Sequence, residues 1–253
     1  MWEVILSIAG FDPSAGGGVL RDSFVIRDFR FFPQGVITAN TVQNSKGVFK
    51  VYYQPPSFII DQIKKLLLDF PIIGIKIGLP HRSKSFNEQL LSLLKSFGGP
   101  IVFDPVLRPT KGICFIKNVK NILPLFYLAD IVTPNYKEFI EIYTSLFGKI
   151  KDLKSAIKNF CRFFNTNLVV KGIKKKNYSM DLLFDLNEGR FYIFKYKKFP
   201  FEVRGTGCTY SSALTCLLAK GFSLKDSVSY AGKYVQKYVK YRLPWAKSIL
   251  YAW

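Results

Sequence analysis

The sequence predicts one three-layer α/β domain in which helices cover both faces of a mostly parallel sheet. Short apolar runs typical of buried strands alternate with longer amphipathic segments through most of the chain. The run 72–77 is almost entirely apolar, as expected of a parallel strand that is covered on both faces. Polar residues follow several of these runs, at the sheet edge where open α/β sheets bind ligands. We expect residues 1–253 to form this single domain.

The predicted elements follow in order from these patterns. Helices are indicated by apolar residues three or four positions apart, and strands by apolar runs that end in glycine, proline or polar residues. The predicted strands span 4–8, 35–41, 72–77, 101–103, 130–132 and 168–170, followed by a hairpin over 180–185 and 190–196. The predicted helices span 19–31, 57–70, 86–97, a segment that begins after glycines 205 and 207, and 223–238.

The composition indicates a folded protein of the cytoplasm. Hydrophobic residues make up 49% of the 253 residues and are spread throughout, which argues against disorder. Charged residues or prolines interrupt each apolar run before it reaches membrane-spanning length, and the chain opens in a strand-like run without a basic leader. We therefore expect no membrane partner and a cytoplasmic location.

Cysteine and histidine usage excludes two classes of enzyme. The four cysteines form no Cys-x-x-Cys pair, and with His81 as the only histidine a His/Cys zinc site is improbable. A Ser-His-Asp hydrolase would have to use His81, which lies in a polar turn and is better interpreted as a surface residue.

The formal charge of +20 and the pI near 9.8 raise the question of nucleic-acid binding. The lysines are scattered over the predicted elements, and 174–176 is their one run of three. This distribution favours a solvated basic surface, so we expect no nucleic-acid partner. A basic surface would also attract ATP and phosphorylated substrates.

The stretch that most directly indicates chemistry is Arg204-Gly205-Thr206-Gly207-Cys208-Thr209. Two glycines let the backbone turn sharply into a helix, whose first N–H groups are unpaired and lie at the positive end of the helix dipole. Such a turn can bind an oxyanion or a phosphate. Cys208 lies where the helix begins, and the same dipole should favour its thiolate, which makes Cys208 a candidate general base or nucleophile. A plain helix entry with a small buried cysteine is the competing interpretation.

Polar residues at other strand ends belong to the same predicted edge. Asp104 and Lys171 each follow a buried strand, and Asn135 and Glu138 lie three residues apart, on one face of a helix. A carboxylate there could organise Mg²⁺ and its waters. An Asn cap with a first-turn Glu explains the second pair equally well.

Two motifs resemble one enzyme family. The run from Ser7 to Gly18, together with Gly-Thr-Gly-Cys-Thr at 205–209 ahead of Ser-Ser-Ala-Leu at 211–214, resembles the hydroxymethylpyrimidine/phosphomethylpyrimidine kinases of thiamin biosynthesis. The similarity runs in order from about residue 5 to about residue 239. It implies a ribokinase-like αβα sandwich.

The resemblance also implies roles for individual residues. Gly205, Thr206 and Gly207 would form the anion hole that faces the transferred phosphoryl group, and Cys208 would act as the base. The residues implied for the pyrimidine pocket are Gly10, Asp22, Gln43, Leu79 and Val106. Gln43 offers a donor and an acceptor side by side, which suits a ring nitrogen next to an amine.

On the nucleotide side the resemblance assigns Lys171, Asn135 and Thr206 to ATP. It assigns Asp104 and Glu138 to Mg²⁺. Two segments depart from the family pattern, namely 108–112 and 173–174, and Leu79 replaces the family's methionine. The contacts of those two segments do not carry over.

The expected function is ATP- and Mg²⁺-dependent phosphorylation of 4-amino-5-hydroxymethyl-2-methylpyrimidine and then of its monophosphate. A pyridoxal-type vitamin kinase on the same fold is the nearest alternative, and a non-catalytic ligand-sensing relative is another. The family usually forms homodimers, so a homodimer is expected. The aromatic tail over 244–253 suits packing either on the domain or on a second subunit.

Overall fold

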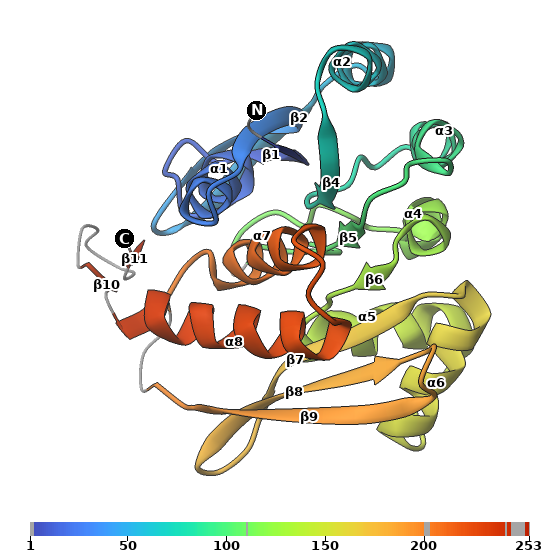
Figure 1. The fold of residues 1–253 in the computed structure, drawn as a ribbon, viewed down its shortest axis with the longest axis vertical. Helices are drawn as coiled ribbons and strands as arrows, with labels where there is room; N and C mark the ends of the chain where they lie inside the picture. The colour runs from blue at the N-terminus through green and yellow to red at the C-terminus, as the bar shows by residue number, and fades with distance from the viewer. Residues whose placement is uncertain (1–2, 110, 200–202, 241, 244–250, 253) are drawn as a thin grey trace.

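The computed structural model describes residues 3–109, 111–199, 203–240, 242–243 and 251–252, and it confirms the predicted fold class. One large sheet separates two layers of helices (Figure 1). Most of the aromatic tail, 244–250 and 253, lies outside the described residues.

The sheet has nine strands in the order β3-β2-β1-β4-β5-β6-β7-β8-β9. Its strands are β1 Val4–Phe11, β2 Phe32–Asn44, β3 Gly47–Tyr53, β4 Ile72–Ile77, β5 Ile101–Phe103, β6 Ile131–Val132, β7 Asn167–Lys174, β8 Tyr178–Asp185 and β9 Arg190–Lys197. The central pairings from β2 to β7 are parallel, whereas β3 and the pair β8 and β9 add antiparallel edges. A short pair, β10 Arg242–Leu243 and β11 Tyr251–Ala252, lies apart from this sheet.

The helices divide between the two faces of the sheet (Figure 1). One layer consists of α1 Gly18–Asp28, α7 Thr206–Ala219 and α8 Leu224–Lys240. The other consists of α2 Pro56–Asp69, α3 Lys84–Leu94, the 3₁₀ turn η1 Val119–Ile122, α4 Leu123–Leu128, α5 Tyr136–Phe147 and α6 Leu153–Phe164. Each layer buries its apolar residues against the strands, which fixes the ends of the parallel strands in one row.

The predicted elements are found with boundaries that differ by up to four residues, and two of these differences change where a residue lies. The strand expected over 35–41 extends over Phe32–Asn44, so Gln43 lies in the strand and not in a following turn. The helix expected to reach residue 31 ends at Asp28, and Phe31 is buried against the core. The hairpin of β8 and β9 is confirmed. The expectation that His81 is a surface residue was wrong, because it is buried between Tyr53 and Phe86.

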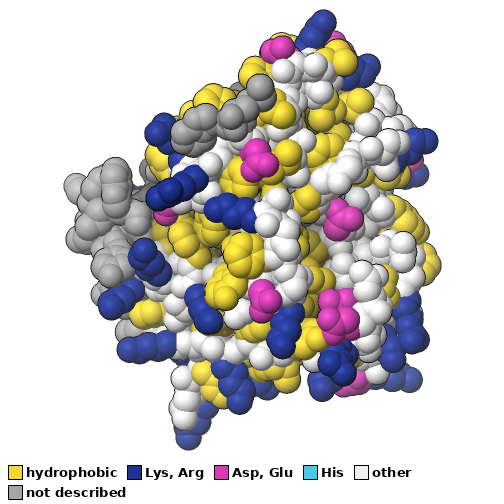
Figure 2. Space-filling model, viewed as in Figure 1, with side chains coloured by type: hydrophobic (Ala, Val, Ile, Leu, Met, Phe, Trp, Pro, Cys, Tyr) yellow, Lys and Arg dark blue, Asp and Glu magenta, His cyan; other side chains and the backbone are white. Residues whose placement is uncertain are grey.

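The positive charge is spread over the surface. Figure 2 shows Lys and Arg side chains over much of one face, interspersed with Asp and Glu and denser toward the end that holds β8 and β9 in Figure 1. Among the described residues, we find no helix with the length and apolar character that a membrane crossing requires.

Candidate active site

The glycine turn ahead of α7 has the geometry that an anion-binding helix N-terminus requires. Gly205 adopts φ +80°, a left-handed conformation, and precedes the first helical residue, Thr206. A Cβ at Gly205 would lie 2.4 Å from the carbonyl oxygen of Gly16, so glycine alone lets this turn and the β1–α1 loop approach each other. The first N–H groups of α7 are thereby presented at the carboxyl edge of the sheet.

Cys208 borders the β1–α1 loop. A Cβ at Gly17 would lie 3.7 Å from the Cys208 Sγ and 3.8 Å from Asp12 Oδ2, so the bare backbone of Gly17 leaves open a small space between the thiol and that carboxylate. No side chain of residue 17 therefore stands between the candidate base and Asp12.

The expectation that the helix dipole favours the Cys208 thiolate was wrong for the ligand-free protein. Burial raises the pKa of Cys208 to about 11, against the opposing effect of the Lys76 ammonium group. The neighbouring carboxylates Asp22 and Asp104 raise it further. Desolvation outweighs the opposing effects of Lys76 and of the Gly18 N–H, so the resting side chain is a thiol.

Asp22 lies beneath the site and is completely buried, so it does not present its carboxylate to a pocket. Its Oδ2 accepts hydrogen bonds from Ser7 Oγ at 2.5 Å and pairs with Lys76 Nζ at 2.7 Å, and its Oδ1 accepts from Ser212 Oγ at 2.8 Å. Lys76 is equally buried, and although burial opposes its charge, Asp22 holds the Lys76 pKa above its usual range. We call Lys76 and Asp22 the sealed pair. Together with Ser7 and Ser212 they connect α1, β1, β4 and α7.

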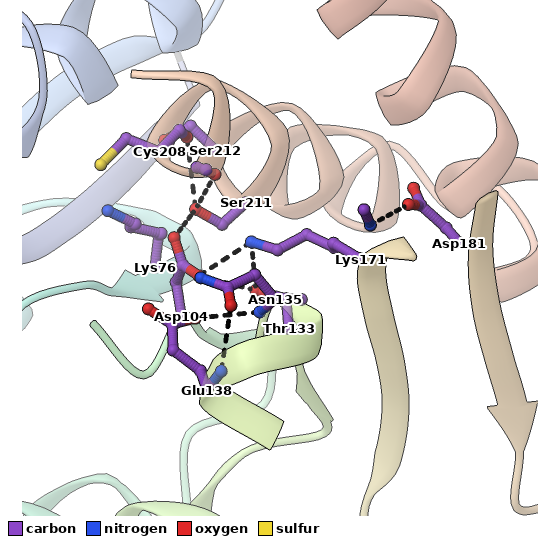
Figure 3. A network of polar contacts seen from close by, with 12 residues as sticks. Lys76, Asp104, Thr133, Asn135, Glu138, Lys171, Asp181, Cys208, Ser211 and Ser212 are labelled. Atoms are coloured by element: carbon purple, nitrogen blue, oxygen red, sulfur yellow. Dashed lines mark hydrogen bonds and ion pairs between the residues drawn. The ribbon is translucent and has the colours of Figure 1, made fainter. Parts of the chain in front are cut away.

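A second lysine–carboxylate pair lies at the edge of the site (Figure 3). Lys171 Nζ is 2.9 Å from Asp104 Oδ1 and 3.5 Å from Thr133 Oγ1, and Ser211 Oγ donates to Asp104 Oδ2 at 3.1 Å. Burial alone would raise the pKa of Asp104, but the Lys171 and Lys76 ammonium groups hold it below its ordinary value. We call Lys171 and Asp104 the open pair. A Cβ at Gly207 would lie 3.6 Å from Asp104 Oδ2, so the open pair lies next to the first turn of α7.

Asn135 and Glu138 form a capping box at the start of α5. The Asn135 side chain accepts from the Glu138 N–H at 3.0 Å, and Glu138 Oε2 accepts from the Asn135 N–H at 2.9 Å. The capping interpretation is therefore confirmed. The capping hydrogen bonds do not neutralise the Glu138 carboxylate. Burial and the nearby Asp104 charge raise the pKa of Glu138 to about 8, as expected of a carboxylate without a sufficient counter-charge.

These carboxylates suit a magnesium ion held largely by water and phosphate. Among the described residues no three His, Cys, Asp or Glu side chains gather as a ligand cluster. Mg²⁺ does not need such a cluster, because it keeps several waters and commonly uses one or two carboxylates beside substrate phosphates. Asp104 and Glu138 are close enough to raise the pKa of Glu138, and a dication between them would relieve that repulsion.

The residues expected around the acceptor lie in β1, near the end of β2 and in the loops after β4 and β5. Gly10, near the end of β1, is in contact with Leu79, since a Cβ at Gly10 would lie 2.7 Å from Leu79 Cδ2. Gln43 lies near the tip of the β2–β3 hairpin, where its Oε1 is 3.5 Å from Arg204 Nη2. Val106 is half-buried two residues after Asp104, to whose carbonyl it donates a backbone hydrogen bond of 2.8 Å.

Four polar residues of this edge were not singled out from the sequence: Lys76, Thr133, Ser211 and Ser212. The two consecutive serines of α7 each donate to a different aspartate, Ser211 to Asp104 and Ser212 to Asp22. Consecutive helical positions point about 100° apart, so the spacing could have indicated two separate partners. The identity of those partners depends on contacts across more than 100 positions of the chain.

In phosphoryl transfer the protein forms few covalent bonds itself, but it must supply cations and N–H donors around the transferred group. The edge built by the open pair and the first turn of α7 offers both. Fold and site together thus indicate a small-molecule kinase with a ribokinase-like fold.

Comparisons with known proteins identify the family. The phosphomethylpyrimidine kinase family matches residues 12–251, and the chain belongs to it. The hydroxymethylpyrimidine/phosphomethylpyrimidine kinase of Aquifex aeolicus is 32% identical over 248 residues, which cover 94% of each chain. The bifunctional chloroplast enzyme of thiamine biosynthesis from Arabidopsis thaliana is 33% identical over 248 residues, which cover 94% of this chain and 46% of the plant protein. The chain therefore spans about half the length of that bifunctional relative.

Solved structures confirm the fold. The phosphomethylpyrimidine kinase of Clostridium difficile has a TM-score of 0.75 at 26% identity, covering 94% of this chain and all of the other. The pyridoxal kinase of Staphylococcus aureus in complex with ADP has a TM-score of 0.86 at 23% identity, covering 100% of this chain and 93% of the other. The second likeness concerns the fold alone and does not favour the pyridoxal alternative.

Proposed function

We propose that this protein uses ATP to phosphorylate 4-amino-5-hydroxymethyl-2-methylpyrimidine and its monophosphate, as a kinase of thiamin biosynthesis. The observation that carries the proposal is the convergence of three groups at one edge of the sheet: the Gly205 turn with its free N–H donors, the Cys208 thiol beside Gly17, and the open pair of Lys171 and Asp104. Family membership supplies the substrate class.

Each group has a distinct part in the proposed reaction. The N–H groups of Thr206, Gly207 and Cys208 bind the charge that develops on the transferred phosphoryl group. Cys208 accepts the proton of the acceptor hydroxyl. Lys171 and Asn135 would bind the phosphates of ATP, and Asp104 and Glu138 would hold Mg²⁺, largely through water. When bound, the ion would supply positive charge beside the triphosphate.

The acceptor pocket in this proposal uses Gln43, Gly10, Leu79 and Val106, while Asp22 supports it from beneath. Gln43 can pair with a ring nitrogen and an exocyclic amine together, a pattern that an aminopyrimidine offers and pyridoxal lacks. A pocket built for that pattern leaves its own polar atoms unpaired when pyridoxal enters.

The test is a comparison of kcat/KM for hydroxymethylpyrimidine and pyridoxal in the parent and in Gln43→Leu. We expect the parent to prefer the pyrimidine by up to about 10⁴-fold, and the variant to lose activity mainly on the pyrimidine. Gln62→Leu, a change of the same kind on the exposed face of α2, should leave both values unchanged. Equal or better turnover of pyridoxal by the parent would replace the proposal with the pyridoxal alternative.

A further inference from the structure

Arg204, the residue before the glycine turn, connects that turn to the β1–α1 loop and to the end of β2. Its Nη1 donates to the Asn44 carbonyl at 2.6 Å, and its Nη2 lies 3.4 Å from Asp12 Oδ2 and 3.5 Å from Gln43 Oε1. The backbone beneath is anchored as well, because Tyr238 Oη donates to the Arg204 carbonyl at 3.0 Å. The guanidinium group therefore lies between the predicted pyrimidine pocket and the anion-binding turn.

Arg204 differs from the two lysines of the site in the length of its contact with a carboxylate. Lys76 is sealed against Asp22, and Lys171 is 2.9 Å from Asp104. The contact of Arg204 with Asp12, at 3.4 Å, is longer than the roughly 2.7–2.9 Å of a charge-assisted hydrogen bond. Its contacts with described residues leave the Nε–H and one Nη1–H of the five-donor fork. Of the three cations that we describe at this site, Arg204 has the longest contact with a carboxylate.

The gap beside Gly17 connects Arg204 with Cys208. The position of a Cβ at Gly17 is 3.8 Å from Asp12 Oδ2, the atom that faces Arg204, and 3.7 Å from Cys208 Sγ. A ligand atom near this position would lie close to both the thiol and the carboxylate that faces Arg204.

The two proposed acceptors differ in charge. The alcohol is neutral, whereas a phosphate monoester carries about −1.5 to −2 at pH 7. Asp22 and Asp104 already balance the charges of Lys76 and Lys171, and both Asp12 and Asp104 are nearly completely buried. A monoester therefore needs a cation that the alcohol does not need, and a guanidinium fork matches a phosphate in two parallel hydrogen bonds.

We propose that Arg204 determines specificity for the phosphorylated acceptor: its guanidinium group binds the acceptor phosphate, which takes the place of Asp12. In the second transfer an oxygen of that phosphate attacks the γ-phosphorus of ATP, the bond from that phosphorus to the β,γ-bridging oxygen breaks, and ADP leaves. The dianionic acceptor has no proton to lose, so this transfer does not require Cys208 as a base. The inference rests on the proposed function.

The experiment measures kcat/KM for hydroxymethylpyrimidine and for its monophosphate in the parent, Arg204→Met and Arg204→Lys. We expect Arg204→Met to lower the ratio of monophosphate to alcohol by about 10–100-fold, the size of a lost hydrogen-bonded ion pair. Arg204→Lys keeps the charge without the fork and should fall between the parent and Arg204→Met. Calorimetry without ATP should show the same weakening for the monophosphate, a readout that does not depend on turnover.

Two comparison variants make the result decisive. Arg108→Met removes a guanidinium group that pairs with Glu141 at an exposed position, and it should leave the ratio unchanged. Cys208→Ala should change the ratio in the opposite direction, because only the alcohol must lose a proton. Equal losses on both acceptors in Arg204→Met, or an unchanged ratio, overturn the role of Arg204. A parent that phosphorylates the alcohol alone also overturns it, whereas a parent that phosphorylates neither acceptor overturns the proposed function.

Discussion

The sealed pair and the open pair lie on two sides of the first turns of α7, and they have the same chemistry in different surroundings. In each, a lysine ammonium group meets an aspartate that also accepts a hydrogen bond from a serine of α7. Both side chains of the Lys76–Asp22 pair are 0% exposed, whereas the side chains of Lys171 and Asp104 are 10% and 4% exposed and Lys171 adjoins Thr133. Figure 3 shows Lys76 and Lys171 on opposite sides of Asp104.

The difference in exposure indicates which pair can exchange its partners for a ligand. Asp22 has three donors around its two oxygens and is 0% exposed, so we expect no ligand to replace any of them. Asp104 and Lys171 lie within reach of Gly207 and influence Glu138, so phosphate and metal can compete for both. The sealed pair thus supports the site, and the open pair takes part in binding.

The largest effect is expected at Cys208, whose pKa responds to both pairs. With a pKa of about 11, its thiolate fraction rises with pH up to that value, so kcat/KM for the alcohol should rise with pH through the neutral and alkaline range. Cys208→Ala should lower kcat by roughly 10²–10⁴-fold and flatten this pH dependence. ATP binding, measured separately, should change little. Unchanged turnover in the variant would reduce Cys208 to a packing residue.

A smaller effect is expected at Glu138, beside the open pair. Its pKa is raised from 4.5 to about 8, so between these values the folded protein binds more protons than the unfolded chain. Stability should therefore fall as pH rises through this window. Glu138→Gln removes the effect: its Tm should match the parent near pH 5 and exceed it near pH 9.

The same variant tests the metal assignment. Glu138→Gln keeps the capping geometry and removes the charge, so half-maximal turnover should require more Mg²⁺. Glu88→Gln, on α3 and paired with Lys84 at an exposed position, is the matched control and should leave the magnesium requirement unchanged. Parallel Tm curves and overlapping magnesium titrations for Glu138→Gln and the parent would contradict the assignment.

Local patterns were sufficient to predict the fold and the glycine turn. The apolar runs predicted the parallel strands because strands covered on both faces have little room for polar residues. Gly205-Thr206-Gly207 predicted the turn because a left-handed residue ahead of a helix requires glycine or a similarly permissive residue.

The electrostatics of the site could not be predicted in the same way. The expectation for the Cys208 thiolate used the helix dipole, a local property, and was overruled by burial, which depends on how α7 packs. Asp22 was assigned to a pocket by its place in the chain, yet its partner Lys76 is 54 positions away and Ser212 is 190. Such contacts follow from the topology of the sheet and carry no short-range signal.

The most direct test of the contrast between the two pairs is urea unfolding of Asp22→Asn and Asp104→Asn side by side. Asp22→Asn leaves Lys76 buried with no direct counter-ion, so it should cost about 3–5 kcal/mol of unfolding free energy. Asp104→Asn should cost less than half as much unfolding free energy, because Lys171 still contacts Thr133. Removal of the Asp104 charge also lowers the pKa of Glu138, whose carboxylate then supplies a negative charge near Lys171. Equal losses in the two variants would contradict the account, since both pairs would then be structural supports of the same kind.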